Sequence, residues 1–182
     1  MGAAYASARV TNAGSRNSKS APRFFDLSHL RGLRGAEQVA AVCYRIRNAR
    51  VEFLLVQTRA ARRWTFPKGS VMPGLSHAQA AALEAFEEGG VHGRMAERPF
   101  AHYTRRKRID GKGSPEIEIV VRAHLCEVTY LEEPPEAGRN PAWFSPEKAK
   151  RRLQEERRSE HGSELVRILD AAVVRIQRSR TN

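Results

Sequence analysis

The segment GSVMPGLSHAQAAALEAFEEGGV, residues 69–91, decides the fold, because it joins a glycine-containing loop to an acidic helix. Ser76 is followed three residues later by Gln79, a pairing typical of the capping box at a helix N-terminus. The consecutive glycines 89 and 90 favour a helix end. The sequence therefore predicts a helix over residues 76–88.

Three carboxylates lie on one face of this predicted helix. Glu84, Glu87 and Glu88 are spaced i, i+3 and i+4, which places them side by side. Like charges at that spacing repel by about 0.2–0.5 kcal/mol per pair on an exposed helix, and a divalent cation such as Mg²⁺, which prefers oxygen ligands, would convert the repulsion into binding. The alternative is an ordinary solvated acidic face. The opposite face is expected to pack inward through Ala78, Ala82 and Phe86.

The loop before the helix has features of a phosphate-binding segment. In PKGSVMPG, residues 67–74, Gly69 and Gly74 allow the backbone to approach a ligand closely. Lys68 supplies a positive charge beside them. Loop and helix together predict a site for a metal ion and a phosphorylated substrate.

Composition limits the class of protein. The 182 residues suffice for one buried domain and a tail, and 41% of them are hydrophobic, as in globular proteins. No apolar run approaches the roughly 18 residues of a membrane span. Cys43 and Cys126 lie in apolar segments without metal-ligand spacing, which indicates buried free thiols in a reducing compartment. We therefore expect a cytoplasmic protein.

The chain is strongly basic. It has 32 Lys and Arg residues against 20 Asp and Glu residues, a formal net charge of +12. This favours polyanionic partners, although an arginine-rich composition common to a whole proteome would give the same charge. We expect a polyanionic small-molecule substrate and no membrane partner. Nucleic acid stays open as a partner, and the sequence does not predict the oligomeric state.

Residues 1–35 and 36–180 differ in kind. The first segment is rich in Ala, Ser, Asn and Gly without periodicity, which predicts a disordered basic tail, with a transit peptide as the alternative. In the second segment, apolar patterns predict strands, the first two joined by a turn at RIRN, residues 45–48. Ser145 with Pro146 predicts a helix start. The expected strands span residues 38–46, 49–58, 98–108 and 116–129, and a last helix spans 163–177.

This order of elements indicates a single α/β sandwich with a mixed sheet. The segment at 69–91 resembles the Nudix box, G-x5-E-x7-R-E-U-x-E-E-x-G-U, where U is a bulky aliphatic residue. The matching positions are Gly69, Glu84, Glu87, Glu88, Gly90 and Val91. WTFPKG before the box and AWFSPEKAKRRL near the end also fit, so the resemblance extends over roughly residues 37–178. It implies the Nudix α/β/α sandwich, with a mixed β-sheet between helices.

Two segments indicate a Nudix subgroup. FLLVQTRAARRWTFPKG and GRNPAWFSPEKA are most similar to the diphosphoinositol polyphosphate and diadenosine polyphosphate phosphohydrolases. Arg59 and Arg63 match arginines that commonly precede the tryptophan in that subgroup. The subgroup's basic residues at the start of the first strand are not matched, since EQV stands there. This weakens an inositol-specific assignment.

The resemblance implies a hydrolase acting on acid anhydrides, in which Mg²⁺ or Mn²⁺ assists the attack of water on phosphorus. The metal ligands would be Glu84, Glu87, Glu88 and the carbonyl of Gly69. Glu84 would also be the catalytic residue, because it would hold the attacking water or act as general base. The substrate would be positioned by Lys68, Arg59, Arg63, Arg105 and Arg106.

Two positions depart from the box in a related way. Leu75 stands where the box has its first glutamate, and Leu83 where it has its arginine; in the family these two often pair and brace the loop against the helix. A buried ion pair can be replaced by an apolar contact without loss of stability, whereas losing one partner strands a charge. The joint change therefore predicts an apolar brace and an active enzyme.

Other functions stay open beside a polyphosphate hydrolase. One is a nucleotide or RNA 5′-end pyrophosphohydrolase, which the basic residues suit; the other is a non-catalytic Nudix module that binds a nucleotide or RNA. Glu116 and Glu118 are candidates for a further carboxylate from outside the box, although an alternating strand would simply expose them. The histidines form no ligand pattern.

Overall fold

The computed structural model describes residues 37–108, 116–155 and 159–181. The tail predicted at residues 1–35 and the turn predicted at 110–115 lie outside the described residues. Within the described part, eight strands form one sheet. In it β1 (Glu37–Arg47) and β7 (Glu116–Leu131) run parallel, and the other strand pairs are antiparallel. The predicted mixed sheet is therefore confirmed.

The sheet order is β3-β2-β1-β7-β5, with β4 paired to β1, β6 to β7 and β8 to β2. β3, β4 and β5 were not predicted, because each has five residues or fewer, too few for a periodic pattern. The remaining strands span β2 (Arg50–Gln57), β3 (Trp64–Thr65), β4 (Lys68–Ser70), β5 (Val91–Met95), β6 (Ala101–Arg108) and β8 (Ala142–Phe144).

The turn between β1 and β2 lies at Asn48 and Ala49, so its predicted position at residues 45–48 was wrong. β1 continues to Arg47, which pairs with Arg50. Asn48 and Ala49 have φ of 49° and 61°, as the two central residues of the tight turn that matches strand twist require. The last residues of β1 are exposed, so no hydrophobic pattern marks them as part of a strand. The predicted turn therefore begins too early.

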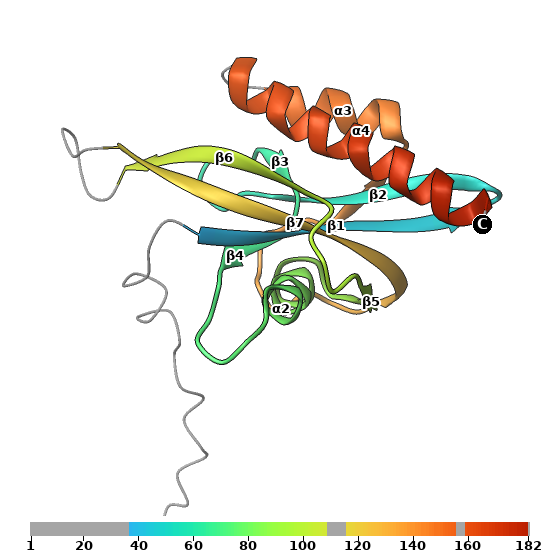
Figure 1. Cartoon of the computed structure of the whole chain (residues 1–182), viewed down its shortest axis with the longest axis horizontal. Helices are drawn as coiled ribbons and strands as arrows, with labels where there is room; N and C mark the ends of the chain where they lie inside the picture. Colours follow the sequence, from blue (N-terminus) through green and yellow to red (C-terminus); the bar gives the residue numbers. More distant parts are fainter. Residues whose placement is uncertain (1–36, 109–115, 156–158, 182) are drawn as a thin grey trace, which may run out of the picture.

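Helices cover both faces of the sheet (Figure 1): α2 (His77–Gly89) lies on one face, and α3 (Pro146–Gln154) and α4 (Ser159–Thr181) lie on the other. The capping box of Ser76 and Gln79 is present. Gly90 follows the last residue of α2 in the left-handed conformation, with φ of 64°, which is typical of a helix C-terminus. The α/β/α sandwich implied by the resemblance is the observed architecture. No helix of the described residues is both long and apolar enough to cross a membrane.

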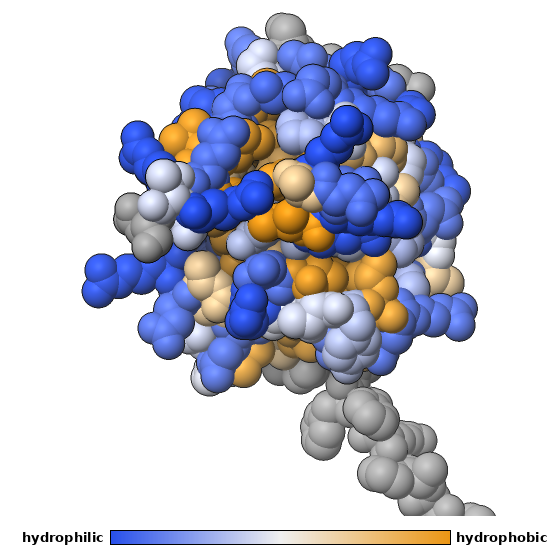
Figure 2. Space-filling view, turned by 90° about the vertical axis from the view of Figure 1, so that its right-hand side faces the viewer, coloured by the Kyte–Doolittle hydropathy of each residue, from blue (hydrophilic) through white to orange (hydrophobic). Residues whose placement is uncertain are grey.

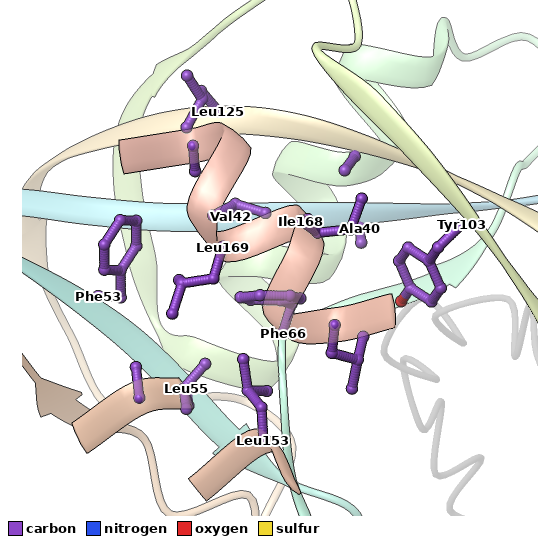
Figure 3. Packing of buried hydrophobic residues seen from close by; sticks show 14 of the residues in the cluster. Ala40, Val42, Phe53, Leu55, Phe66, Tyr103, Leu125, Leu153, Ile168 and Leu169 are labelled. Carbon is purple, nitrogen blue, oxygen red and sulfur yellow. The ribbon is translucent and has the colours of Figure 1, made fainter. Parts of the chain in front are cut away.

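The larger apolar cluster lies between the sheet and α4. Figure 3 shows Ile168 and Leu169 of α4 beside Val42 of β1 and Phe66, and all four side chains are fully buried. Phe66 lies between β3 and β4, so its burial anchors the WTFPKG segment in the core. The burial of Phe66 therefore holds β4, which carries Lys68 and Gly69, in a fixed position.

A second cluster lies between the sheet and α2. Cys43 and Cys126 belong to it; both are buried and free, and they are register partners on β1 and β7. The prediction of buried free thiols is confirmed. Because α2 packs on this cluster, its acidic residues are held at a fixed distance from β4.

Candidate active site

The acidic helix turns two of its three glutamates toward the protein interior. Glu84 and Glu88 are 3% and 2% exposed, whereas Glu87 is half-buried. The prediction that the opposite face packs inward was wrong: the buried alanines are Ala80, Ala81 and Ala85, not Ala78 and Ala82. The alanines of this helix cover more than half of its circumference, so their spacing does not single out one buried face. Phe86 is only partly buried, and its ring meets that of His92 edge to face.

Two consecutive residues of β4 contact the buried carboxylates. The backbone N–H of Lys68 donates to Oε2 of Glu88 at 3.2 Å. Gly69 lies so close to Glu84 that a Cβ at position 69 would overlap the carboxylate group. The structure thus brings Lys68, Gly69, Glu84 and Glu88 together, with Glu87 beside them on the helix.

A chain of ion pairs from the loop between β7 and β8 covers Glu88. Nη2 of Arg139 lies 2.7 Å from Oε1 of Glu88 and 2.6 Å from Oε2 of Glu136. Nε of Arg139 donates to the same Glu136 oxygen at 2.7 Å. Arg59 extends the chain, with its Nη2 3.3 Å from Oε2 of Glu136. The predicted Arg59 therefore joins the site through Glu136.

The sequence did not predict Arg139 and Glu136 as site residues. The sequence around Arg139, GRNPAWF, indicates only a similarity to a subgroup and no role for Arg139 or for Glu136 before it. Nothing in the sequence shows that this loop returns to the C-terminal end of the acidic helix. The carboxylate from outside the helix that adjoins Glu88 is Glu136.

Burial governs the charge of Glu88. Loss of water raises the pKa of its carboxyl, and the nearby charge of Glu136 adds to the rise. The charges of Lys68 and Arg139 and the hydrogen bond from the Lys68 backbone lower that pKa without cancelling the effect of burial. Carboxyl groups perturbed in this way concentrate at functional sites. A cation bound beside Glu88 would favour its ionised form.

The other predicted substrate-binding arginines have different surroundings. Arg63 is exposed, and its backbone N–H donates to Oγ1 of Thr58 at 3.1 Å. Arg105 pairs in register with Ile119, whose side chain belongs to the cluster under α4, so Arg105 points to the face opposite α2. Arg106 is exposed and lies across from Glu118. The structure does not bring Arg105 to the glutamates.

Glu118 and the histidines are not seen to form a metal-binding cluster among the described residues. Glu118 is exposed, as an alternating strand predicts, and the side chain of Glu116 lies outside the described residues. Among the side chains that the structure describes, no three His, Cys, Asp or Glu residues are arranged to hold a metal ion by themselves. His124 is fully buried, with Nδ1 2.9 Å from the carbonyl of Ala96. Any metal at the glutamates would therefore need further oxygen ligands, from the backbone, from water or from a substrate.

The two leucines at the brace positions have different surroundings. Leu75 packs against the cluster between α2 and the sheet. Leu83 is half-buried on α2 and is not a member of either cluster of the described residues. An apolar contact between them stays a prediction.

A surface groove lies away from the glutamates. It has a volume of about 570 Å³ and is lined by Phe100 together with residues of α4 that include Val174, Arg175 and Arg178. The side of the molecule that carries the C-terminal half of α4 combines hydrophilic surroundings with a hydrophobic centre (Figure 2). Because α4 and α2 cover opposite faces of the sheet, this groove is separate from the candidate active site.

Residues 36–165 match the family model of the NUDIX domain. No curated protein sequence matches the chain. Among solved structures, a binary complex of the C. elegans Ap4A hydrolase is 27% identical, with a TM-score of 0.57, and the match covers 77% of this chain and 98% of that chain. A NUDIX hydrolase from Nitrosomonas europaea is 19% identical, with a TM-score of 0.54 and coverage of 78% and 90%. The NUDIX domain of Shewanella oneidensis NrtR, complexed with ADP ribose, is 17% identical, with a TM-score of 0.56 and coverage of 79% and 89%. The last two show the fold alone.

Proposed function

Because the chain belongs to the Nudix family, we propose that it is a metal-dependent hydrolase that cleaves a pyrophosphate linkage in a polyphosphate substrate. One observation carries the proposal: Glu84 and Glu88 are both buried and both contact the glycine-containing strand β4. Arg139 pairs with one oxygen of Glu88, and carboxylate oxygens gathered beside β4 are the hard donors that a divalent cation prefers. The alternative of a solvated acidic face does not fit two buried side chains.

The donor set fits Mg²⁺ or Mn²⁺. Two buried carboxylates and the half-buried Glu87 provide hard oxygen donors, and Mg²⁺ is commonly held by one or two carboxylates, water and substrate phosphates. Residues proposed as ligands are Glu84, Glu87, Glu88 and the Gly69 carbonyl. Such an ion would neutralise charge on phosphate oxygens and make water a better nucleophile.

The protein's own groups would orient the reactants. Glu84, held against Gly69, would act as general base toward the attacking water. Lys68 on β4 and Arg59, which already reaches the site through Glu136, would bind phosphate oxygens. Arg63 lies in the same loop as Arg59 and would extend this basic rim. Holding water and phosphate at fixed positions supplies a large part of the rate of such reactions.

Two observations support a dinucleoside polyphosphate as substrate. The fold is similar to that of an Ap4A hydrolase over nearly all of that protein, at 27% identity. The net charge of +12 suits a long polyphosphate chain. A diphosphoinositol polyphosphate is the second candidate. Inhibition by inositol hexakisphosphate but not by ATP would favour the inositol compound.

A non-catalytic module that binds a nucleotide or RNA is the alternative from another class. Leu75 and Leu83 at the brace positions are the observation in its favour. The similar fold of a domain complexed with ADP ribose is compatible with it. Tight nucleotide binding without turnover in Mg²⁺ or Mn²⁺ would support the binding module over the hydrolase.

The test is a substrate panel assayed with Mg²⁺ and with Mn²⁺. It contains dinucleoside polyphosphates, diphosphoinositol polyphosphates, nucleotide sugars, nucleoside triphosphates and 5′-triphosphorylated RNA, with the released products identified by ³¹P NMR. We expect turnover of a polyphosphate, abolished by Glu87→Gln and retained by Glu97→Gln, which changes an exposed glutamate after β5. No turnover of any substrate would refute the proposal.

A further inference from the structure

Glu88 is a buried carboxylate in a box that lacks its usual arginine. Leu83 occupies the arginine position and Leu75 the position of its partner. The side chain of Glu88 is only 3% exposed, and a buried charge without a partner is strongly destabilising. The charge that compensates Glu88 must therefore come from elsewhere in the chain.

Arg139 provides that charge. Its side chain is 12% exposed, and its Nη2 lies 2.7 Å from Oε1 of Glu88. Nη2 and Nε both contact Oε2 of Glu136, at 2.6 and 2.7 Å. The guanidinium group thus bridges two carboxylates, and together the three side chains carry one negative charge. A planar guanidinium group fixes the orientation of a carboxylate as well as its charge.

The loop that carries Arg139 is attached to the helix and to the sheet by backbone hydrogen bonds. The N–H of Glu132 donates to the Gly90 carbonyl and that of Glu136 to the Glu87 carbonyl, both at 2.9 Å. The N–H of Gln57 on β2 donates to the carbonyl of Arg139 itself at 2.6 Å. Arg139 is therefore held in place from both sides before any ligand arrives.

We infer that Arg139 is a positioning residue that compensates the buried charge of Glu88 and presents Glu88 to the metal ion. A carboxylate has about four acceptor sites. The Lys68 N–H occupies one on Oε2 and Arg139 occupies one on Oε1, so acceptor sites remain on both oxygens for a cation. The inference rests on the proposed function, because it assigns Glu88 to a metal.

The first arm of the test uses metal-free protein and measures Tm for Arg139→Ala, Glu88→Gln and the double variant. Breaking a buried pair in a chain of this size lowers Tm by about 6–20 °C, and we expect Arg139→Ala to do so. In the Glu88→Gln background the same change should cost less than half as much, because position 88 then carries no charge and Glu136 keeps its ion pair with Arg59. Equal losses in both backgrounds would overturn the inference, whatever the enzyme hydrolyses.

The second arm measures Mn²⁺ affinity by electron paramagnetic resonance, below the unfolding temperature of every variant. Loss of groups that orient a ligand typically weakens metal binding by about 10–100-fold, so we expect that loss in Arg139→Ala. Arg139→Lys, which keeps the charge but not the planar fork, should recover part of it. The matched control is Arg94→Ala, which removes an exposed arginine–glutamate pair with an N–O distance of 2.7 Å on β5 and should bind Mn²⁺ like wild type.

The two arms separate the possible failures. Wild-type affinity in Arg139→Ala, or no recovery in Arg139→Lys, would overturn the positioning role while the hydrolase proposal stands. Absence of Mn²⁺ binding by the wild-type protein, with the Tm coupling intact, would overturn the metal assignment that both proposals share.

Discussion

Replacing Gly69 with alanine tests whether the position of the Glu84 carboxylate governs the reaction. Gly69 lies on β4 and is not among the described glycines with positive φ, so alanine suits the backbone. Its methyl group would overlap the carboxylate of Glu84. Because Glu84 is 3% exposed, its carboxylate has little free space into which it could move. Helix and strand must separate, or the side chain must change rotamer.

The size of the effect follows from this geometry. Restoring van der Waals contact requires a shift on the order of 1 Å, and a misplacement of that size can cost about 100-fold in rate, or about 2.7 kcal/mol of transition-state stabilisation. Overpacking itself costs about 1–3 kcal/mol, which corresponds to a Tm lower by about 2–12 °C. The variant should therefore be folded at about 20 °C and almost inactive.

The assay compares kcat and KM on the best substrate of the panel at that temperature. We expect kcat to fall about 100-fold with a smaller change in KM, because Glu84 acts on the attacking water rather than on substrate binding. Ser70→Ala is the control, since successive side chains of a strand point to opposite faces. A Gly69→Ala variant whose kcat stays within about twofold of wild type would refute the assignment of Glu84, given the close approach at Gly69.

Two further predictions concern stability. Leu83→Arg should lower Tm, because the half-buried side chain would introduce an unpaired charge on the helix that Leu75 helps to anchor; adding Leu75→Glu should restore part of the loss. An unchanged Tm in the single variant would contradict the apolar brace. Burial lowers the pKa of His124; the hydrogen bond to the Ala96 carbonyl raises it by less, and the charges of His77 and Arg122 lower it further. Since the folded pKa lies below the unfolded value of about 6.5, the unfolded chain binds more protons as pH falls. The stability contribution is therefore complete above the unfolded pKa and is lost as pH falls through the folded one. Tm measured between about pH 7.5 and 5 should fall more steeply for wild type than for His124→Gln, and parallel curves would contradict this.

Local features of the chain were predictable because each depends on near neighbours. The capping box at Ser76, the stop at Gly90 and the start of α3 after Ser145 are all present in the structure. Each is a hydrogen-bonding arrangement within a few residues, so the sequence contains all its parts. The prediction of a mixed sheet between helices was also correct. It rested on the order of the elements along the chain and on the resemblance to the Nudix family.

Predictions that depended on burial were less accurate. The acidic helix was expected to bury Ala78, Ala82 and Phe86, whereas it buries Glu84 and Glu88 with other alanines. Hydrophobic spacing cannot anticipate a buried carboxylate, because the compensation comes from groups distant in sequence. The prediction that Arg105 lies at the substrate failed for a similar reason. Strand register decides which face of the sheet a side chain takes, and a run of basic residues does not indicate the register.

The sequence alone determined that this protein is an α/β domain built around an acidic helix and a glycine-containing loop, because both are local patterns. Only the tertiary structure decided which positively charged side chain pairs with Glu88. The loop between β7 and β8 is attached to the end of α2 and to β2 by backbone hydrogen bonds, and this brings Arg139 to within 2.7 Å of Glu88. Backbone hydrogen bonds between distant segments carry no residue-specific signal, so this arginine could not be identified before the chain was folded.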